Sequence, residues 1–351
     1  MKVSSLKLLI VDDSVLVRNI LTNEFSSDDE IDVVGSANDL ISAKEKILEL
    51  KPDIMTLNIE MADMDSIELL RIIMPLFPIP VIVASSLTKR GADLTLEALD
   101  NGAIDFILMP EEFSVTSSER LIFEFKSKLK MASQVDVSNW TDKRTLFYGS
   151  NTIIKKRVKS SIKKVIAIGA STGGTDAIYN LLCQLPLHTP GIVIVQHFPP
   201  LFATRFAARL NQQTHFSVKE AESGDIISNG NVYIAPGGTQ MTVNKSGEDY
   251  ILSCLVGDKV NGYLPSVGAL FNSMALNVGK NGFGIILTGM GEDGALEIKE
   301  MKDAGAFTIG QDEKSSIVYS MPKVSKNIGG LCKVVSIEQM GSVINDRLEA
   351  M

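Results

Sequence analysis

Cysteine is scarce in this chain of 351 residues, which has only Cys183, Cys254 and Cys332, all far apart. Zinc ligands usually come in closely spaced pairs, and a disulfide framework needs an even number of cysteines at regular intervals. Neither pattern is present. We therefore expect three reduced, buried thiols with no metal-binding or redox role.

Long apolar runs are also missing, since none approaches the ~20 residues that a helix needs to cross a bilayer. The first short run, residues 8–11, leads straight into Asp12 and Asp13. A signal peptide would instead extend its apolar stretch to a small-residue cleavage site. The sequence predicts a cytoplasmic protein that does not insert into membranes.

Basic residues are outnumbered: 34 Lys and Arg stand against 42 Asp and Glu, a formal net charge of −8. Proteins that bind nucleic acid need a basic surface to displace the counterions around phosphates. The second half of the chain also has no helix-turn-helix pattern, which argues against a transcription factor. The sequence therefore predicts no nucleic-acid partner.

What is present is apolar material for two domains, because 45% of the residues are hydrophobic. In the first third, short β-type runs alternate with helical periodicity, which is typical of parallel βαβ units. The expected strands are residues 7–11, 32–35, 54–59, 81–84 and 103–108, and a helix over 117–130 closes the unit. We predict a (βα)5 doubly wound domain over residues 1–131.

Residues 132–160 lose this pattern and are predicted to form a linker. This stretch holds the sole tryptophan, Trp140, and a basic run at 155–159. A solvated surface explains such a charge run more simply than a docking site for an acidic partner does. A second alternating series follows over 161–351.

The second series predicts another doubly wound α/β domain with a mostly parallel sheet. Its expected strands are residues 165–169, 192–195, 232–235, 284–287, 307–309 and 333–335. Residues 244–249 contain Gly247 between two β-type runs, which indicates the turn of an added β-hairpin. The predicted fold class is α/β throughout, in two domains.

Three strand ends of the second domain carry a serine, a histidine and an aspartate. In parallel sheets the working residues gather at the carboxyl edge, where strands end and helices begin. The residues that follow these strands are Ser171, His197 and Asp293. We expect them to meet at one edge of the sheet.

Together these residue types have a chemical meaning. A serine hydroxyl becomes a nucleophile when an imidazole takes its proton, and a carboxylate fixes the imidazole tautomer. Glycines near Ser171 let the backbone turn so that N–H groups reach a developing oxyanion, and the glycines flanking Met290 suggest a second donor there. The sequence thus predicts a Ser-His-Asp triad.

Each residue has a simpler alternative explanation. A serine before a helix is often an N-cap, Gly-Glu-Asp-Gly is often a turn, and a lone histidine is often a core residue. Residues 169–174 also resemble a phosphate-binding loop, but they lack its lysine and its glycine spacing. The common placement at one sheet edge favours the triad.

The first domain has acidic residues at its own strand ends. Asp12 and Asp13 end the first strand, Asn58 lies in the third and Ser85 ends the fourth. Two carboxylates beside a third would form a magnesium site that receives a phosphoryl group. Because the third acid is missing, Asp13 is at best a weak metal ligand. The alternative is that Asp12 and Asp13 cap a helix.

At these motifs the chain closely resembles the chemotaxis response-regulator methylesterases, the protein-glutamate methylesterase/protein-glutamine glutaminase family. The matching segments are Ile168-Gly-Ala-Ser171-Thr-Gly-Gly174, Val195-Gln-His197, Tyr233-Ile-Ala-Pro-Gly237 and Leu287-Thr-Gly-Met-Gly-Glu-Asp293-Gly294. The resemblance implies that Ser171 is the nucleophile, His197 the base and Asp293 the orienting acid. It also places Thr172 and Met290 beside the reacting carbonyl.

The family resemblance further implies a reaction and its partners. The expected reaction is hydrolysis of γ-glutamyl methyl esters, and deamidation of certain glutamines, on methyl-accepting chemoreceptors during chemotaxis adaptation. A chemotaxis histidine kinase is the expected second partner, through an N-terminal response-regulator receiver. No cofactor is implied for the hydrolysis.

Two departures from the family affect the receiver. The family pattern after the third strand resembles Asp-Val-Glu-Met-Pro-x-Met-Asp-Gly, but here Asn58 replaces the phosphate-accepting aspartate. Met109 also stands where the family has a lysine before Pro110. Because both changes affect one reaction, we expect a receiver that is not phosphorylated, with Asp12, Asp13 and Ser85 left at its site.

A third departure lies in the second domain. The family segment resembles Asn-Arg-His-Arg-Pro-Ser-Val-Asp, whereas residues 261–268 read Asn-Gly-Tyr-Leu-Pro-Ser-Val-Gly. These losses favour an alternative in which both folds serve only as docking surfaces of a non-catalytic signalling protein. The intact triad favours an enzyme, since a docking surface does not require those three residue types.

Overall fold

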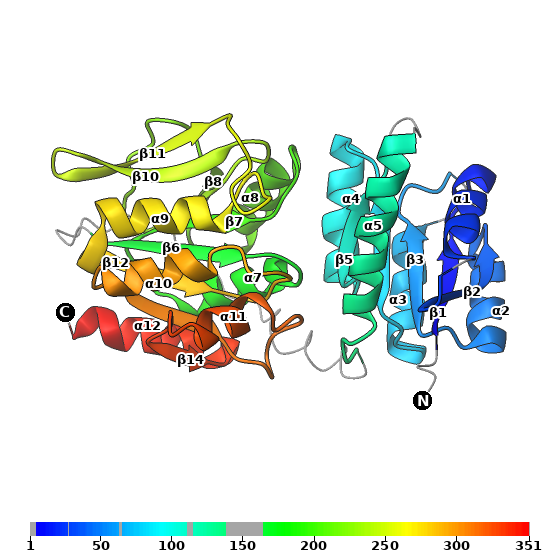
Figure 1. Ribbon diagram of the computed structural model, residues 1–351. Coiled ribbons are helices and arrows are strands. Elements are labelled where there is room, and N and C mark those ends of the chain that lie inside the picture. The colour runs from blue at the N-terminus through cyan, green and yellow to red at the C-terminus, as the bar shows by residue number, and fades with distance from the viewer. Residues whose placement is uncertain (1–4, 27, 63–64, 111–114, 138–163, 351) are drawn as a thin grey trace. The chain divides into compact units, whose positions relative to one another are not determined.

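The computed structural model describes residues 5–26, 28–62, 65–110, 115–137 and 164–350. The chain divides into two compact units, Met1–Gly149 and Ser150–Met351. Most of the predicted linker 132–160, with Trp140 and the basic run 155–159, lies outside the described residues. Each unit is therefore described by itself (Figure 1).

The first unit is a five-stranded parallel sheet in the order β2-β1-β3-β4-β5. Its strands are β1 (Leu6–Val11), β2 (Ile31–Ala37), β3 (Ile54–Asn58), β4 (Val81–Ser85) and β5 (Asp105–Leu108). Its helices are α1 (Val15–Phe25), α2 (Leu40–Leu50), α3 (Ser66–Leu76), α4 (Lys89–Asp100) and α5 (Val115–Ala132). The predicted (βα)5 architecture is confirmed.

Local sequence explains where the helices of this unit begin. Ser14, Asp39, Asp65 and Thr88 each precede a helix and accept a hydrogen bond from an N–H of its first turn. The cap of α1 is thus Ser14. The alternative that Asp12 and Asp13 cap a helix is wrong, because both precede this cap. Asp12 accepts from the N–H of Ser14 itself, and Asp13 accepts from Asn58 and Ala62.

The second unit is built on a seven-stranded sheet in the order β14-β13-β12-β6-β7-β9-β8, parallel at every pairing. The strands are β6 (Val165–Ala170), β7 (Gly191–Gln196), β8 (Ser217–Glu220), β9 (Asn231–Ile234), β12 (Gly282–Ile286), β13 (Phe307–Gln311) and β14 (Lys333–Val335). Sequence patterning missed only β8, an edge strand whose four residues alternate between exposed and buried sides too briefly to stand out.

The predicted hairpin is also present, as β10 (Gln240–Ser246) and β11 (Asp249–Leu255). It lies against α9 (Val267–Asn277), which in turn packs on β6 (Figure 1). The remaining helices are α7 (Gly174–Gln184), α8 (Phe202–Gln213), α10 (Ala295–Asp303), α11 (Met321–Asn327) and α12 (Ile337–Glu349), with a 3-10 turn, η1 (Gly279–Asn281). Helices α9 and α10 pack together, as do α7 and α12.

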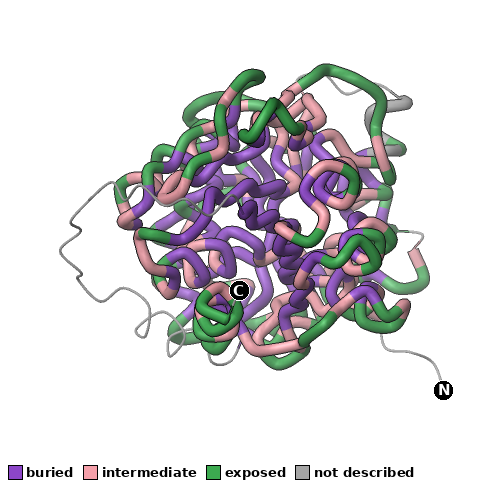
Figure 2. Tube along the Cα trace, turned by 90° about the vertical axis from the view of Figure 1, so that its left-hand side faces the viewer, coloured by how far each residue is buried: buried purple, intermediate pink, exposed green. Residues whose placement is uncertain are grey.

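The central strands of both sheets are nearly continuous apolar runs because helices cover both of their faces. All six residues of β6 and all six of β7 are buried. Figure 2, which faces the second unit, accordingly shows buried backbone at its centre and exposed backbone around it.

The cysteine expectation is wrong in part. All three thiols are free, but Cys183 and Cys332 are exposed and Cys254 is half-buried. Each lies near an element boundary or on a helix face that the apolar core does not cover.

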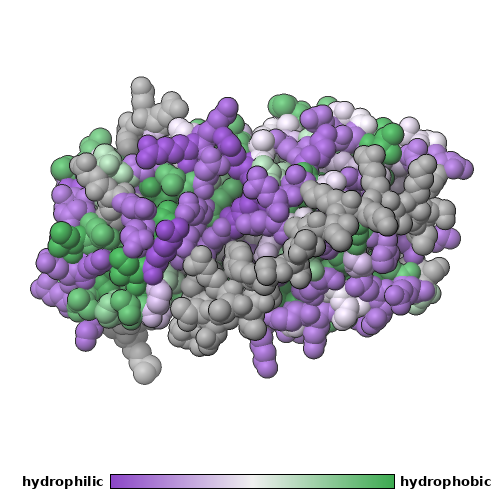
Figure 3. Space-filling view, turned by 180° about the vertical axis from the view of Figure 1, so that it is seen from behind, coloured by the Kyte–Doolittle hydropathy of each residue, from purple (hydrophilic) through white to green (hydrophobic). Residues whose placement is uncertain are grey.

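No helix in the described part of the chain is long and apolar enough to cross a membrane. On the molecular face seen in Figure 3, hydrophilic side chains are interspersed with hydrophobic ones.

Candidate active site

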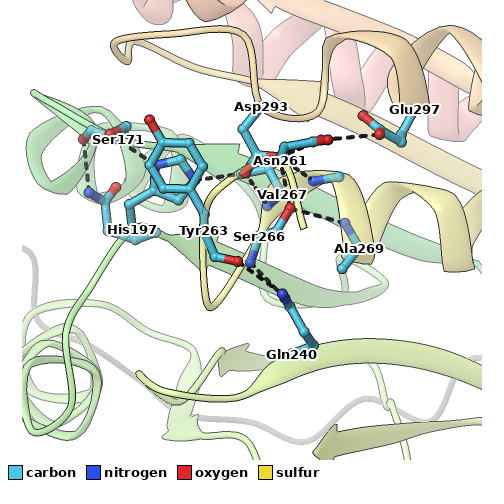
Figure 4. A network of polar contacts seen from close by, with 12 residues as sticks. Ser171, His197, Gln240, Asn261, Tyr263, Ser266, Val267, Ala269, Asp293 and Glu297 are labelled. Carbon is cyan, nitrogen blue, oxygen red and sulfur yellow. Dashed lines mark hydrogen bonds and ion pairs between the residues drawn. The ribbon is translucent and has the colours of Figure 1, made fainter. Parts of the chain in front are cut away.

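The carboxyl ends of three neighbouring strands bring the predicted triad together. Ser171 follows β6, His197 follows β7, and Asp293 lies in the loop between β12 and α10. Oγ of Ser171 is 3.2 Å from Nδ1 of His197, and Nε2 of His197 is 2.8 Å from Oδ2 of Asp293. The three side chains therefore form one continuous chain of hydrogen bonds (Figure 4).

The orientation of His197 assigns its tautomer. A carboxylate can only accept, so Nε2 carries the proton toward Asp293 and Nδ1 presents its lone pair to the Ser171 hydroxyl. The ring of Tyr263 stacks on the imidazole with a centroid separation of 3.8 Å and an interplanar angle of 9°. This stack covers one face of the imidazole and limits its rotation.

Asp293 is the most thoroughly hydrogen-bonded carboxylate of the site. It is 1% exposed, and five groups of the described residues donate to it. These donors are Nε2 of His197, Nδ2 of Asn261, Oγ of Ser266 and the N–H groups of Val267 and Gly268. Burial raises the pKa of Asp293, but the His197 bond and the other donors outweigh it and leave the pKa below its usual value.

Helix α9 supplies three of these donors because it begins directly at the carboxylate. Ser266 is its N-cap, and its Oγ accepts from the N–H of Ala269 while it donates to Asp293. The positive end of the helix dipole adds to the stabilisation of a negative charge there. Gly169 allows this approach, because a Cβ on it would lie 2.2 Å from Cγ1 of Val267.

Around Ser171, backbone groups are already engaged in hydrogen bonds. The N–H of Ser171 donates to the carbonyl of Thr288, and the Ser171 carbonyl accepts from Nε2 of Gln196. The N–H of Ser171 is therefore not available to an oxyanion. No described residue accepts a hydrogen bond from the N–H of Met290, which leaves that group available as a donor.

Thr172 and Met290 lie close in sequence to Ser171 and Asp293, respectively. Thr172 directly follows Ser171 and is buried, and its carbonyl accepts from Oγ1 of Thr288. Met290 is half-buried in the loop that leads to Asp293. Thr172 therefore lies in the loop that carries Ser171, and Met290 lies in the loop that carries Asp293.

Sequence reasoning missed the residues that hold Asp293 in place, chiefly Ser266 and Asn261. A serine directly before an apolar helical stretch is a recognisable N-cap signal, so Ser266 could have been found as a cap. Its second bond, to a residue 27 positions away, has no counterpart in the local sequence. Asn261 likewise reaches Asp293 only through the tertiary fold.

At the edge of the first sheet, the five expected receiver residues also meet. Asp12, Asp13, Asn58, Ser85 and Met109 all follow or end parallel strands. Nδ2 of Asn58 donates to Oδ1 of Asp13 at 3.1 Å, and the N–H of Met109 donates to the carbonyl of Ser85. The Ser85 hydroxyl, 1% exposed, donates to the carbonyl of Ser86 at 3.3 Å.

These residues fit a magnesium ion poorly. Both oxygens of Asp13 already accept, from Asn58 and from the N–H of Ala62. Burial raises the pKa of Asp12 to about 6, which weakens it as an anionic ligand. Among the described residues no group of three or more His, Cys, Asp or Glu side chains could hold a metal ion.

The fold and the site together define the class: an α/β protein that joins a receiver-type sheet to a sheet carrying a Ser-His-Asp arrangement. Comparison with known families agrees with this class. Residues 166–344 match the CheB methylesterase family, and residues 8–115 match the response regulator receiver domain. The chain belongs to the CheB methylesterase family.

Named relatives extend over almost the whole chain. A protein-glutamate methylesterase/protein-glutamine glutaminase of Syntrophotalea carbinolica is 44% identical over 344 residues, covering 98% of both chains. That of Escherichia coli K12 is 39% identical and covers 99% of this chain and 98% of its own. The crystal structure of the Thermotoga maritima CheB methylesterase catalytic domain is 32% identical, with a TM-score of 0.50, over 51% of this chain and 95% of that one.

Proposed function

We propose that this chain is a protein-glutamate methylesterase in which Ser171, His197 and Asp293 are the catalytic residues. The observation that carries the proposal is the unbroken chain of hydrogen bonds from Oγ of Ser171 through the imidazole to the Asp293 carboxylate. The relatives' name, protein-glutamate methylesterase/protein-glutamine glutaminase, supplies the substrate class. Glutamyl methyl esters are the primary substrates, and glutamine side chains are the secondary ones.

Acylation begins when Nδ1 of His197 takes the hydroxyl proton as Oγ of Ser171 attacks the ester carbonyl carbon. The carbonyl electron pair moves onto oxygen and forms a tetrahedral oxyanion. When this intermediate collapses, the C–OCH3 bond breaks and the leaving oxygen takes the proton from His197. Methanol departs, and the glutamyl group remains esterified to Ser171.

Deacylation repeats these steps with water as the nucleophile. His197 removes a proton from water, the hydroxide oxygen bonds to the acyl carbon, and Ser171 leaves with that proton. The product is a glutamic acid side chain, which loses its remaining proton to solvent and becomes the carboxylate. With a glutamine substrate the first leaving group is ammonia. Asp293 stays ionised throughout and stabilises the imidazolium, which its low pKa favours.

The oxyanion needs N–H donors, and the available N–H of Met290 is one candidate. Thr172 lies beside the nucleophile and shapes the same region. Every step of this mechanism uses water and side chains of this chain, so the hydrolysis calls for no metal or organic cofactor.

The family assignment supports methyl-accepting chemoreceptors as the protein substrate and chemotaxis adaptation as the process, in the cytoplasm where receptor signalling helices lie. The receiver fold supports a chemotaxis histidine kinase as a second partner. We further propose that the receiver accepts no phosphoryl group, because the amide of Asn58 is a very weak nucleophile and Met109 provides no cation.

A non-catalytic docking protein is the competing function, and the altered segment 261–268 is the observation that favours it. One experiment separates the two. Methanol release from a methylated receptor fragment is measured for the wild type, for Ser171→Ala and for Ser316→Ala, a serine outside the triad, as a control. We expect Ser171→Ala to lose at least about a thousandfold in rate and the control to stay near the wild type. Normal turnover by folded Ser171→Ala would overturn the esterase proposal.

A further inference from the structure

Glu297 lies on the first turn of α10, one helical turn after Asp293, and its carboxylate turns toward the site. Its Oε1 accepts a hydrogen bond from Nδ2 of Asn261 at 3.1 Å. The same Nδ2 donates to Oδ1 of Asp293 at 2.9 Å. One side-chain amide therefore bridges two carboxylates (Figure 4).

The position of Glu297 also has an ordinary explanation. An acid in the first turn of a helix is stabilised by the positive end of the helix dipole. The helix dipole explains why an acidic residue is found at position 297. It does not explain why the Glu297 carboxylate points inward toward Asn261, whereas the adjacent Leu296 is 66% exposed. Oε2 of Glu297 is buried without a hydrogen-bond partner among the described residues. Burying a carboxylate oxygen is costly, so the bond to Asn261 has to offset that cost.

Asn261 is held in an uncommon conformation by these contacts. Its φ is +52°, in the left-handed region, which asparagine tolerates better than most residues do. Both N–H groups of its amide are used, one for each carboxylate. If the acceptor on Glu297 were lost, the amide could rotate away from Asp293.

Space for the Glu297 carboxylate exists because residue 268 is a glycine. A Cβ on Gly268 would lie 2.5 Å from Nδ2 of Asn261 and 2.9 Å from Cδ of Glu297. A side chain at 268 and the present position of Glu297 therefore exclude each other. The family pattern quoted above has aspartate at this position, so a carboxylate at 268 and one at 297 would occupy the same place.

We propose that Glu297 is a positioning residue of the hydrolase: its carboxylate holds the Asn261 amide against Asp293, which keeps Asp293 aligned with Nε2 of His197. The kcat measurement that tests this inference rests on the proposed esterase function, whereas the positioning role is argued from the geometry of the site. Alignment of the triad affects proton transfer, whereas Glu297 does not reach the substrate. The effect should therefore fall on kcat and leave KM unchanged.

The first test compares Glu297→Ala and Glu297→Gln in the full chain, with methanol release from a methylated receptor fragment as the assay. Glu297→Ala should lower kcat about tenfold, the rate equivalent of one charge-assisted hydrogen bond, with KM unchanged. Glutamine keeps an acceptor at Oε1, so Glu297→Gln should retain most of the activity. Glu300→Ala, an exposed acid of the same helix, is the matched control and should behave as the wild type does.

The second test moves the carboxylate. Gly268→Asp alone should lower both kcat and the melting temperature, because its side chain overlaps Asn261 and Glu297. Glu297→Gly alone should lower kcat about tenfold, for the same reason as Glu297→Ala. The double variant Gly268→Asp/Glu297→Gly should recover most of both quantities, since the new carboxylate fills the vacated space. Independent sites would instead give additive losses.

Two substrate-independent measurements separate failure of this inference from failure of the proposed function. These are the rate at which a fluorophosphonate labels Ser171, which reports triad alignment, and the melting temperature. If no variant releases methanol but labelling slows in Glu297→Ala and recovers in the double variant, the substrate assignment fails and the positioning role stands. If labelling and kcat are unchanged in Glu297→Ala, or if the double variant shows only additive losses, the positioning role is overturned.

Discussion

Asp12 in the first unit and Asp293 in the second are both buried aspartates beyond the end of a parallel strand, yet their pKa values shift in opposite directions. Asp12 is 4% exposed, and burial raises its pKa to about 6, with the N–H of Ser14 only partly offsetting that effect. Asp293 is buried as deeply, but its hydrogen-bond donors lower its pKa. The number of donors, and not burial by itself, decides whether a buried carboxyl stays charged.

The same contrast separates the two sheet edges as a whole. The second edge directs donors at a single carboxylate and leaves the Ser171 hydroxyl facing the lone pair of a ring nitrogen, which is the arrangement that the proposed hydrolysis requires. The first edge satisfies its polar groups internally, as the bond from Asn58 to Asp13 illustrates. One edge, the prepared edge, is therefore organised around a charge, and the other, the closed edge, pairs its polar groups with one another.

Of the changes that test this contrast, removal of the charge at the prepared edge should have the largest effect, although a smaller one than loss of the Ser171 hydroxyl. Asp293→Asn should lower kcat about 10⁴-fold, because an amide cannot hold the Nε2–H tautomer of His197 and cannot satisfy all of the donors around it. The measurement is single-turnover hydrolysis of a methylated receptor fragment. Asp303→Asn, an exposed acid at the end of the next helix, is the control. If folded Asp293→Asn protein lost less than about tenfold in kcat, the charge of Asp293 would not be the feature that distinguishes the second sheet edge from the first.

The next effect concerns the closed edge. We expect no labelling of the wild type by a small phosphodonor, partial labelling of Asn58→Asp, and more in Asn58→Asp with Met109→Lys. A carboxylate restores the nucleophile, and a lysine restores the cation that pairs with the phosphoryl group. Labelling is quantified by intact mass, and esterase activity is followed in parallel. Stable labelling of the unmodified chain, with activation, would refute the degenerate-receiver hypothesis.

A third prediction uses the raised pKa of Asp12. Asp12→Asn should raise the free energy of unfolding of the first unit by about 2 kcal/mol at pH 7, since it removes a charge that burial disfavours. Asparagine can still accept from the N–H of Ser14. Hydrogen exchange of first-unit amides in the full chain measures the change. An unchanged or lower free energy of unfolding would contradict the inference that burial destabilises the charged form of Asp12.

The pH dependence should have opposite signs in the two units. The folded state of the first unit binds a proton at Asp12 more tightly than the unfolded state does, so the Asp12 contribution to stability falls as pH rises from 3.8 to about 6. The contribution of Asp293 is present above pH 3.8 and is lost as pH falls below that value. The same exchange experiment, run from below pH 3.8 for Asp293 up to about pH 6 for Asp12, tests both signs, and each slope should vanish in the corresponding asparagine variant.

The smallest expected effect concerns the stack on His197. Tyr263→Ala should lower kcat about fivefold, because an aromatic pair contributes roughly 1 kcal/mol and the imidazole then rotates more freely. Tyr263→Phe keeps the ring and should retain the wild-type rate. If both variants behaved alike, the hydroxyl or the segment as a whole would matter more than the stack.

Much of this fold could be predicted because parallel strands that are buried on both faces have short, continuous apolar sequences, as β6 and β7 do. The edge strand β8 escaped detection because its alternation is only four residues long. The cysteines were misjudged for a related reason. Cysteine side chains are usually buried in proteins, and this general tendency was the basis of the prediction. The exposure of Cys183 and Cys332 depends instead on which helix face or loop each of them occupies.

Sequence reasoning was enough to predict that Ser171, His197 and Asp293 lie at one edge of the second sheet, because each follows a recognisable parallel strand and such strands align their carboxyl ends. The proposal that the receiver is not phosphorylated likewise depends on two residue identities, Asn58 and Met109. The way in which Asp293 is held, in contrast, is visible only in the three-dimensional structure. Its donors Asn261 and Ser266 lie 32 and 27 residues away along the chain. Contacts over such separations follow from how α9 and α10 pack on the sheet, which no local pattern encodes.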